Sequence, residues 1–340
     1  MNAVAQAILE QELWSSSSDP ERGLALKLVG ICSVNRREWL ITDMAANSVE
    51  VTTVPLYETL GPDMLALILE QTRVETVFGS AQNLETMLRF VEEREVGLRR
   101  FVCFDEEAQE LAAWGARRGI QVLFFRDLLR QKGEQARVLQ ARERAGLESV
   151  FTISYTSGTT NNSKGVVVSN RNFIGALTNI RQVGTEFAIH PSDSYISYLP
   201  LAHVFDRLGC YSCLSVGASV GFFGGDLLKI PDDLVLLRPT LFASVPRLLN
   251  KVYDKILKRV QDGSYLKQYL FNKGVNAKVD QLKLDGQMHN RLYDQIVFNK
   301  ARQRLGGNIR LMITASAPIA PNILQFLKVV FCCPIVEAYG

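Results

Sequence analysis

The stretch from residue 154 to residue 170, SYTSGTTNNSKGVVVSN, combines many hydroxyl side chains with two glycines and one lysine. Gly158 and Gly165 let the backbone bend and come close to an anion, and the hydroxyls can donate hydrogen bonds to phosphate oxygens. Lys164 adds a compact positive charge. The same composition is typical of a polar surface turn, so composition alone leaves a phosphate loop and a plain turn both open.

The order of residues in this stretch differs from that of a P-loop. A Walker A loop has Gly before its Lys and continues into a helix, whereas Ser163 precedes Lys164 here and the β-branched run GVVVS follows. We therefore expect residues 155–165 to join two strands, with no helix dipole directed at the phosphates.

Strand-like and helix-like segments alternate on both sides of this loop, which predicts an α/β fold with two doubly wound, mostly parallel sheets flanked by helices. The turn formers SSSSDPERG at 15–23 are predicted to end an N-terminal helix. Predicted strands before the loop cover 25–34, 50–57, 75–80 and 99–105, and predicted helices cover 35–49, 62–72 and 81–93.

With 340 residues, the chain exceeds the roughly 250–300 residues at which one hydrophobic core stops growing. We expect a first α/β subdomain over 1–190, with the phosphate loop at 155–165, and a second over 191–340. Ligands of open α/β sheets bind beyond the carboxyl ends of strands. Because Gly340 follows a predicted strand directly, we expect the sequence to stop inside its own active site.

Charge is concentrated in the second half of the chain. Between residues 251 and 310 there are thirteen Lys or Arg against five Asp or Glu, although the whole chain carries only +3. The basic helical segment 247–305 can meet a membrane surface or a phosphorylated ligand, or it can be an ordinary solvated face. No interleaving of basic and aromatic residues indicates a nucleic-acid platform, so we expect no nucleic-acid partner.

The remaining composition excludes several classes. Six cysteines in a chain this long do not indicate a secreted disulfide framework, and we predict that Cys210 and Cys213 are buried thiols, not metal ligands. Glu10 and Glu12 stand where a signal peptide would be basic. No apolar run reaches the ~18–20 residues that span a bilayer, so we expect neither a signal peptide nor a transmembrane segment in these 340 residues.

The order YTSGTTNNSKG resembles the TSGTTGxPKG loop of the adenylate-forming enzymes. Asn161 replaces a glycine and Ser163 a proline, changes that loosen the loop without removing a hydroxyl or the lysine. YLPLAHVFDR, GFFGGD, VPRLLNKVYDKI, LGGNIRLMITASAP and VEAYG then follow in the order seen in long-chain fatty-acid–CoA ligases. This resemblance runs from about residue 31 to residue 340.

The resemblance implies that ATP activates a long-chain fatty acid as an acyl-adenylate, which CoA converts to acyl-CoA, with Mg²⁺ as the metal. His203 would lie beside the acyl carboxylate, and Tyr339 would stack on adenine. The implied phosphate-holding residues are Thr156, Ser157, Gly158, Thr159, Thr160 and Lys164. The implied adenine-pocket residues are Ala315, Ser316, Ala317, Pro318, Glu337, Ala338, Tyr339 and Gly340.

In the family, the motif ending at Gly340 continues with a Glu that binds Mg²⁺, and a small C-terminal domain supplies a catalytic lysine. Neither lies within these residues, so we expect this chain to be weakly active or inactive alone. A non-catalytic module that binds nucleotide or fatty acid is the alternative, while LAHVFDR and the basic segment argue against an aryl or short-chain acid ligase. The resemblance also implies a membrane-facing basic segment on the cytosolic side of the endoplasmic reticulum or peroxisome.

Overall fold

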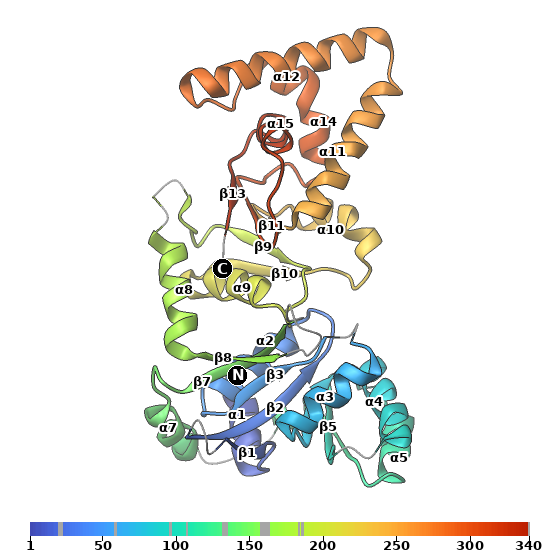
Figure 1. Cartoon of the computed structure of the whole chain (residues 1–340), viewed down its shortest axis with the longest axis vertical. Coiled ribbons are helices and arrows are strands. Elements are labelled where there is room, and N and C mark those ends of the chain that lie inside the picture. Colours follow the sequence, from blue (N-terminus) through green and yellow to red (C-terminus); the bar gives the residue numbers. More distant parts are fainter. Residues whose placement is uncertain are drawn as a thin grey trace. The chain divides into compact units, whose positions relative to one another are not determined.

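The computed structural model forms two units, each an α/β arrangement (Figure 1). The first comprises Met1–Asn179 with Pro200–Val204, and the second comprises Ile180–Leu199 with Phe205–Gly340. Mainly parallel sheets flanked by helices confirm the predicted fold class. The division predicted near residue 190 stays a prediction. The structure describes residues 1–19, 23–57, 60–94, 97–106, 108–130, 135–156, 164–182, 184 and 187–338.

The first unit is built on an eight-stranded sheet with the order β6-β5-β4-β2-β3-β7-β8, in which β1 also pairs with β2. The β1–β2 and β7–β8 pairs are antiparallel, and the other pairs are parallel. The strands are β1 (Ser15–Asp19), β2 (Leu24–Cys32), β3 (Thr52–Pro55), β4 (Thr76–Gly79), β5 (Arg100–Cys103), β6 (Gln121–Phe124), β7 (Val150–Thr156) and β8 (Lys164–Ser169).

Helices cover this sheet, and the apolar residues of α3 and α4 show why. Ile68 of α3 and Leu84 of α4 are fully buried in one core with Val77 and Phe101 of the sheet. Ser80 caps α4 by accepting a hydrogen bond from the Asn83 N–H, as expected for serine at a helix start. The helices are α1 (Asn2–Glu10), α2 (Arg37–Asn47), α3 (Pro62–Thr72), α4 (Ala81–Glu93), α5 (Gln109–Ala116), α6 (Phe125–Arg130), α7 (Gln135–Arg144) and α8 (Asn170–Gln182).

The second unit contains a five-stranded parallel sheet with the order β10-β9-β11-β12-β13. Successive side chains of β9 point to opposite faces. Ile196 therefore joins the main core, whereas the Tyr195 hydroxyl bonds Asp206 of α9 (Val204–Val216). The strands are β9 (Ser194–Ser197), β10 (Ser219–Phe222), β11 (Leu241–Ser244), β12 (Leu311–Thr314) and β13 (Ile335–Glu337).

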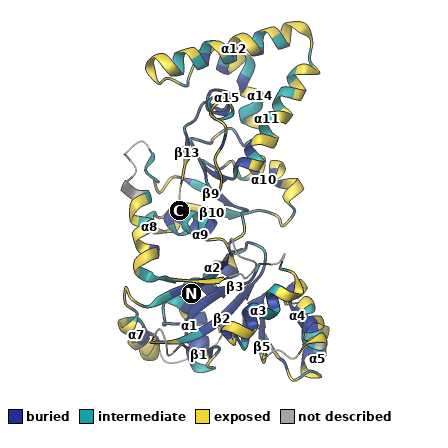
Figure 2. Ribbon diagram, viewed as in Figure 1, coloured by how far each residue is buried: buried dark blue, intermediate teal, exposed yellow. Residues whose placement is uncertain are grey.

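The basic segment is helical, as predicted, and its inner face is aromatic. The Phe271 ring lies 5.5 Å from that of Phe298 and 6.1 Å from that of Phe326, measured between centroids. Figure 2 shows an exposed outer surface on α12, in contrast to the buried strands. The helices are α10 (Ile230–Leu237), α11 (Pro246–Gln261), α12 (Tyr265–Asp285), α13 (Arg291–Tyr293), a π-helix (Asp294–Phe298), α14 (Asn299–Gln303) and α15 (Pro321–Phe331).

One local prediction is wrong and another is confirmed. Ser15–Asp19 is a strand instead of a turn, because it pairs antiparallel with β2 and the Ser15 hydroxyl donates to the Leu28 carbonyl at 3.3 Å. Cys210 and Cys213 are buried free thiols, as expected. Among the described residues, we find no helix with the length and apolarity that crossing a bilayer requires.

Candidate functional site

The carboxyl ends of β12 and β13 bring most of the predicted adenine-pocket residues together. These neighbouring parallel strands pair Thr314 with Glu337, and the Ala338 N–H donates to the Thr314 carbonyl at 2.8 Å. The Ile319 N–H donates to a Glu337 carboxylate oxygen at 3.5 Å, which ties the segment after β12 to the end of β13. The residues gathered here are Ala315, Ser316, Ala317, Pro318, Glu337 and Ala338.

This strand end presents a small, exposed surface. Ser316, Ala317 and Pro318 are exposed, and Ser316 adopts a left-handed backbone with φ of 79°. Beneath them, the hydroxyl of Thr314 is buried without a hydrogen-bond partner among the described residues. Small side chains at the end of a parallel sheet leave space for a flat ring to approach the backbone. Tyr339 and Gly340 lie outside the described residues.

The predicted phosphate loop lies between the strands of an antiparallel hairpin in the first unit. β7 ends at Thr156 and β8 begins at Lys164, and these two residues are directly paired. This setting confirms the expectation that the loop joins two strands. Lys164 is exposed at the start of the edge strand β8. Ser157, Gly158, Thr159 and Thr160 lie outside the described residues.

Close packing at the base of the hairpin explains Gly165. A Cβ at this position would lie 2.8 Å from a methyl group of Ile153 and 3.1 Å from the ring of Tyr155. The Tyr155 hydroxyl donates to the Gln71 side chain at 3.0 Å, and burial raises the pKa of Tyr155 to about 12. The tyrosine therefore stays neutral and holds β7 against α3 while β8 passes over it.

His203 belongs to the first unit, in the short segment Pro200–Val204. The Leu201 N–H donates to the buried Asn35 side chain at 2.9 Å, and the His203 N–H donates to the Pro200 carbonyl at 2.8 Å. Asn35 follows β2, so the segment that carries His203 is held at the carboxyl end of that strand. His203 keeps an exposed face, but the surrounding protein desolvates its imidazole and lowers the pKa of His203, which favours the neutral form at pH 7.

The YLPLAHVFDR motif also contains two charged residues, and their environment differs from that of His203. Asp206 and Arg207 are fully buried in α9, and Asp206 accepts hydrogen bonds of 2.6 Å from both the Tyr195 and Ser197 hydroxyls. Burial and the Asp206 charge raise the pKa of Tyr195, so its hydroxyl remains a donor. Asp206 therefore fastens α9 to β9.

Sequence reasoning missed the positioning roles of Asn35 and Asp206. Asn35 directly follows the strand predicted over 25–34, and Asp206 lies in the first turn of a helix that follows the strand β9. Polar residues just beyond strands are the available signal, because they stand where a parallel sheet builds its sites.

Residues 24–340 match the family model described as AMP-binding enzyme. The chain is 39% identical to the peroxisomal long chain acyl-CoA synthetase 6 of Arabidopsis thaliana over 92% of its own length and 43% of that protein. It is 34% identical to long-chain-fatty-acid–CoA ligase 5 of Rattus norvegicus, over 92% of this chain and 46% of the relative. The chain thus spans less than half of either relative.

Solved structures share the fold. The adenylation domain of a carboxylate reductase from Mycobacterium chelonae superimposes with a TM-score of 0.70 at 18% identity, covering 100% of this chain and 49% of that one. The A domain of a carboxylic acid reductase from Segniliparus rugosus, solved with AMP and a co-purified carboxylic acid, gives 0.64 at 19% identity. It covers 100% of this chain and 62% of that one.

Proposed function

Because the chain belongs to the AMP-binding enzyme family, we propose that it activates a long-chain fatty acid with ATP and transfers the acyl group to CoA. The similarity of 33–39% identity to long-chain acyl-CoA synthetases over 92% of the chain carries this proposal. Carboxylate reductase domains share only the fold, so they do not decide the acyl substrate.

The proposed reaction has two steps. The fatty-acid carboxylate attacks the α-phosphorus of ATP, the bond to the bridging oxygen breaks, and pyrophosphate leaves. The CoA thiol then attacks the acyl carbonyl, a thioester forms, and AMP leaves. Both steps build negative charge on phosphate oxygens, which positioned donors and cations stabilise.

In this proposal the hairpin holds phosphate and the strand ends hold adenine. Thr156 and Lys164 flank the loop. Lys164 is exposed, so its ammonium stays hydrated and can contact an anion without being buried first. The small residues after β12, with Glu337 and Ala338, would border the base. His203 would face the acyl carboxylate as a neutral imidazole. A neutral imidazole can donate a hydrogen bond to the carboxylate, whereas a protonated one would form an ion pair that makes the carboxylate less nucleophilic.

A Mg²⁺ site finds little support in the described residues. Mg²⁺ prefers oxygen ligands in octahedral geometry. The one cluster of potential ligands in the described part of the chain is His289, Asp294 and Cys332, which offers one nitrogen, one sulfur and only one carboxylate oxygen. These residues do not fit Mg²⁺.

Pyrophosphate exchange tests the proposal. We expect the purified chain to incorporate labelled pyrophosphate into ATP at a low rate and only when a long-chain fatty acid is present, and we expect Lys164→Ala to reduce this exchange further. Lys300→Ala, which removes another exposed lysine, is the matched control. Saturable ATP or fatty-acid binding without exchange would instead support the non-catalytic binding module.

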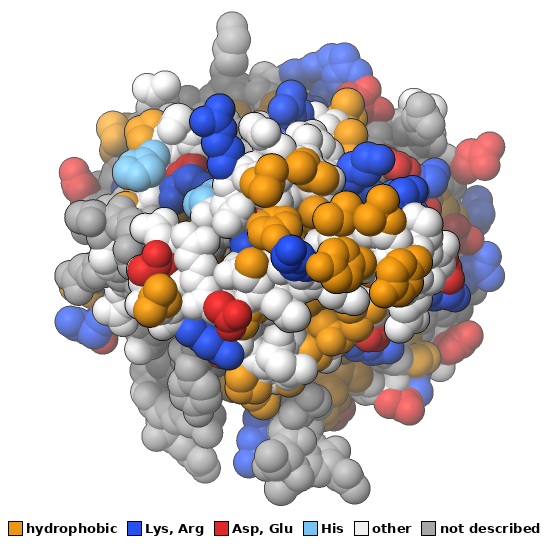
Figure 3. Space-filling view, turned by 90° about the horizontal axis from the view of Figure 1, so that it is seen from above, with side chains coloured by type: hydrophobic (Ala, Val, Ile, Leu, Met, Phe, Trp, Pro, Cys, Tyr) orange, Lys and Arg blue, Asp and Glu red, His pale blue; other side chains and the backbone are white. Residues whose placement is uncertain are grey.

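The basic segment supports a second, separate proposal of contact with an anionic membrane. Tyr265 is 84% exposed, Leu266 65% and Tyr269 51%, on a helix that also carries exposed lysines. Figure 3 shows hydrophobic side chains gathered beside Lys and Arg on one face. Aromatic and basic residues together suit the interface of an anionic bilayer.

Vesicle co-sedimentation tests this contact. We expect binding to vesicles rich in phosphatidylserine and loss of binding when the exposed residues Lys255, Lys258 and Arg259 are all changed to Gln. Equal sedimentation of the variant and the unmodified chain would contradict it.

A further inference from the structure

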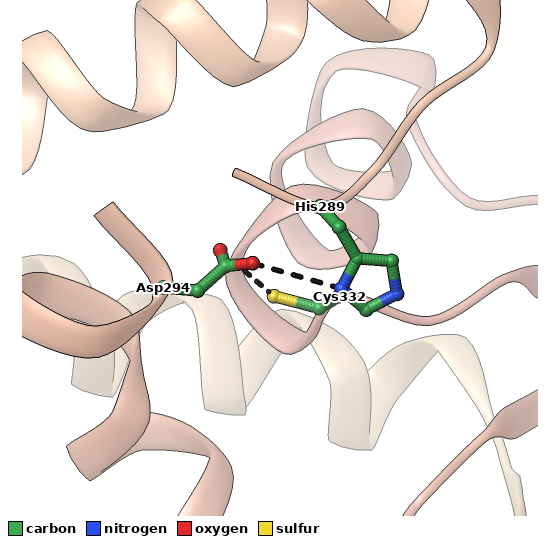
Figure 4. A group of neighbouring side chains, drawn as sticks. All are labelled: His289, Asp294 and Cys332. Carbon is green, nitrogen blue, oxygen red and sulfur yellow. Dashed lines mark hydrogen bonds and ion pairs between the residues drawn. The ribbon is translucent and has the colours of Figure 1, made fainter. Parts of the chain in front are cut away.

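A lysine, a cysteine and an aspartate meet inside the second unit, before the amino end of β13. Lys278 comes from α12, Asp294 begins the π-helix, and Cys332 ends α15 in a left-handed conformation with φ of 55°. Lys278 is 0% exposed and Cys332 is 5% exposed. Figure 4 shows the Asp294 carboxylate directed at the Cys332 sulfur, with His289 on the other side. None of these side chains has a role in the proposed acyl activation.

The contacts place the lysine nitrogen against the cysteine sulfur. Lys278 Nζ donates to the Asp294 carboxylate and to Cys332 Sγ, which lies 2.9 Å away. The Cys332 thiol donates to Asp294 Oδ1 at 3.2 Å. Lys278 Nζ also lies 4.8 Å from the centre of the Phe298 ring, and the Asn290 N–H fixes the other Asp294 oxygen at 2.9 Å. Nitrogen and sulfur are thus held at contact by three separate elements.

A metal ion is the competing interpretation of this cluster. The ligand atoms of His289, Asp294 and Cys332 lie within 4.8 Å of one another. However, the Lys278 ammonium already contacts both the carboxylate and the sulfur, and the lysine side chain is fully buried. A divalent cation would be repelled by this charge in a medium of low dielectric constant. The lysine therefore occupies the position that a metal would need.

We propose that Lys278 and Cys332 form a covalent nitrogen–oxygen–sulfur bridge when the protein is oxidised by hydrogen peroxide. An oxygen added to Cys332 Sγ is in contact with Lys278 Nζ at once, because the two atoms already touch. Asp294 contacts both groups and holds the Lys278 nitrogen against the Cys332 sulfur. The buried lysine is thus kept next to the oxidised sulfur.

The reaction proceeds in two oxidations. The Cys332 thiolate attacks one peroxide oxygen, the O–O bond breaks, and hydroxide leaves, which gives the sulfenic acid. The hydroxide takes a proton from the Lys278 ammonium and becomes water, and the amine nitrogen then bonds to the sulfenic oxygen. Formation of this nitrogen–oxygen bond releases two electrons, together with the sulfenic O–H proton and one amine N–H proton. A second peroxide takes up these electrons and protons and becomes two waters. Thiol, amine and two peroxides therefore become the bridge and three waters.

The bridge would fasten α12 to the turn between α15 and β13, five residues before Glu337. Burial raises the pKa of the Cys332 thiol, although the Lys278 hydrogen bond opposes this effect. Since the thiolate is the form that attacks peroxide, bridge formation should become faster as the pH rises.

Peptide mass spectrometry tests the bridge. The purified chain is treated with hydrogen peroxide, denatured, alkylated and digested. We expect a linked peptide pair containing Lys278 and Cys332, heavier than the two peptides by one oxygen and lighter by two hydrogens, which dithiothreitol separates. A linked pair without the added oxygen, or Cys332 as sulfinic acid with Lys278 free, would overturn the proposal.

Three variants make the result specific. Cys332→Ser keeps an acceptor for Lys278, and the linked pair should fall to background. Cys333→Ser removes the neighbouring buried thiol and should leave the yield unchanged, which also excludes a disulfide between the two cysteines. Lys278→Met combined with Asp294→Asn removes both charges together, so the fold does not retain an unpaired buried charge, and Cys332 should then stop at its own oxygen acids. Persistence of the linked mass in Cys332→Ser would refute the assignment.

Discussion

The two edges of the parallel sheet in the second unit are built in opposite ways. At the amino edge, Asp193, Thr240 and Arg310 directly precede β9, β11 and β12, and the side chains of Thr240 and Arg310 both bond the buried Asp193 carboxylate. At the carboxyl edge, β12 and β13 end in small, exposed residues with one left-handed backbone position. The difference indicates that the amino edge stabilises the sheet, whereas the carboxyl edge is exposed where we propose that the adenine base binds.

Removing the arginine of the amino edge should have the largest effect. Arg310→Ala leaves the Asp193 carboxylate, 3% exposed, without its cationic partner, so we expect a loss of about 3 kcal/mol in the free energy of unfolding. Urea denaturation measures it, with the exposed Lys300→Ala as control. An equal loss in both variants would show that the amino edge has no special role.

Acid should weaken the same edge. Burial disfavours the Asp193 carboxylate, but hydrogen bonds from Arg310, Thr240 and the His190 N–H outweigh it and lower the pKa of Asp193 from 3.8 to about 2. Its contribution is complete above pH 3.8 and is lost as the pH falls towards 2, a change of about 2 kcal/mol. Denaturation curves between pH 5 and pH 2 should lose this dependence in Asp193→Asn.

Substitution of Thr240, an uncharged residue of the amino edge, should reduce the free energy of unfolding less than the loss of Arg310 does. The Thr240 hydroxyl donates to Asp193 and accepts from the Ser194 N–H at 3.0 Å. Thr240→Val keeps the shape and removes both bonds, so we expect a loss of about 1.5 kcal/mol, measured by urea denaturation. A neutral outcome would mean that Arg310 alone holds the carboxylate.

At the carboxyl edge, a substitution should increase the free energy of unfolding instead of reducing it. Ser316 has a φ of 79°, a conformation that glycine adopts without strain. Ser316→Gly should therefore stabilise the fold by up to about 1 kcal/mol in thermal or chemical denaturation. Destabilisation by this change would show that the serine side chain, and not only the backbone, supports the edge.

Periodicity and motif order predicted most of the elements, because helices such as Pro62–Thr72 and Ala81–Glu93 have clear start signals and apolar faces. Ser15–Asp19 was missed because serine and aspartate favour turns locally, whereas pairing with β2 is a tertiary effect. The segment order around β12 and β13 was predictable from their motifs, and the structure then brought the two strand ends together.

Buried polar partners could not be predicted in the same way. Lys278 lies in a segment whose composition indicates a solvated basic face, yet it is wholly buried beside Asp294 and Cys332. Asp193 and Arg310 are 117 residues apart in the chain, and no local pattern connects them. Pairs that depend on the meeting of distant segments leave no periodic trace in the sequence.

Because the segment Pro200–Val204 belongs to the first unit, the chain passes between the two units three times. The backbone leaves the first unit after Asn179, returns for five residues, and departs again before Phe205. A gene divided at the first crossing would therefore encode a first unit whose Asn35 lacks the Leu201 amide that it binds. Neither unit is encoded by one continuous stretch of sequence. We therefore expect recombination between relatives to be tolerated poorly when the crossover lies between residues 180 and 204.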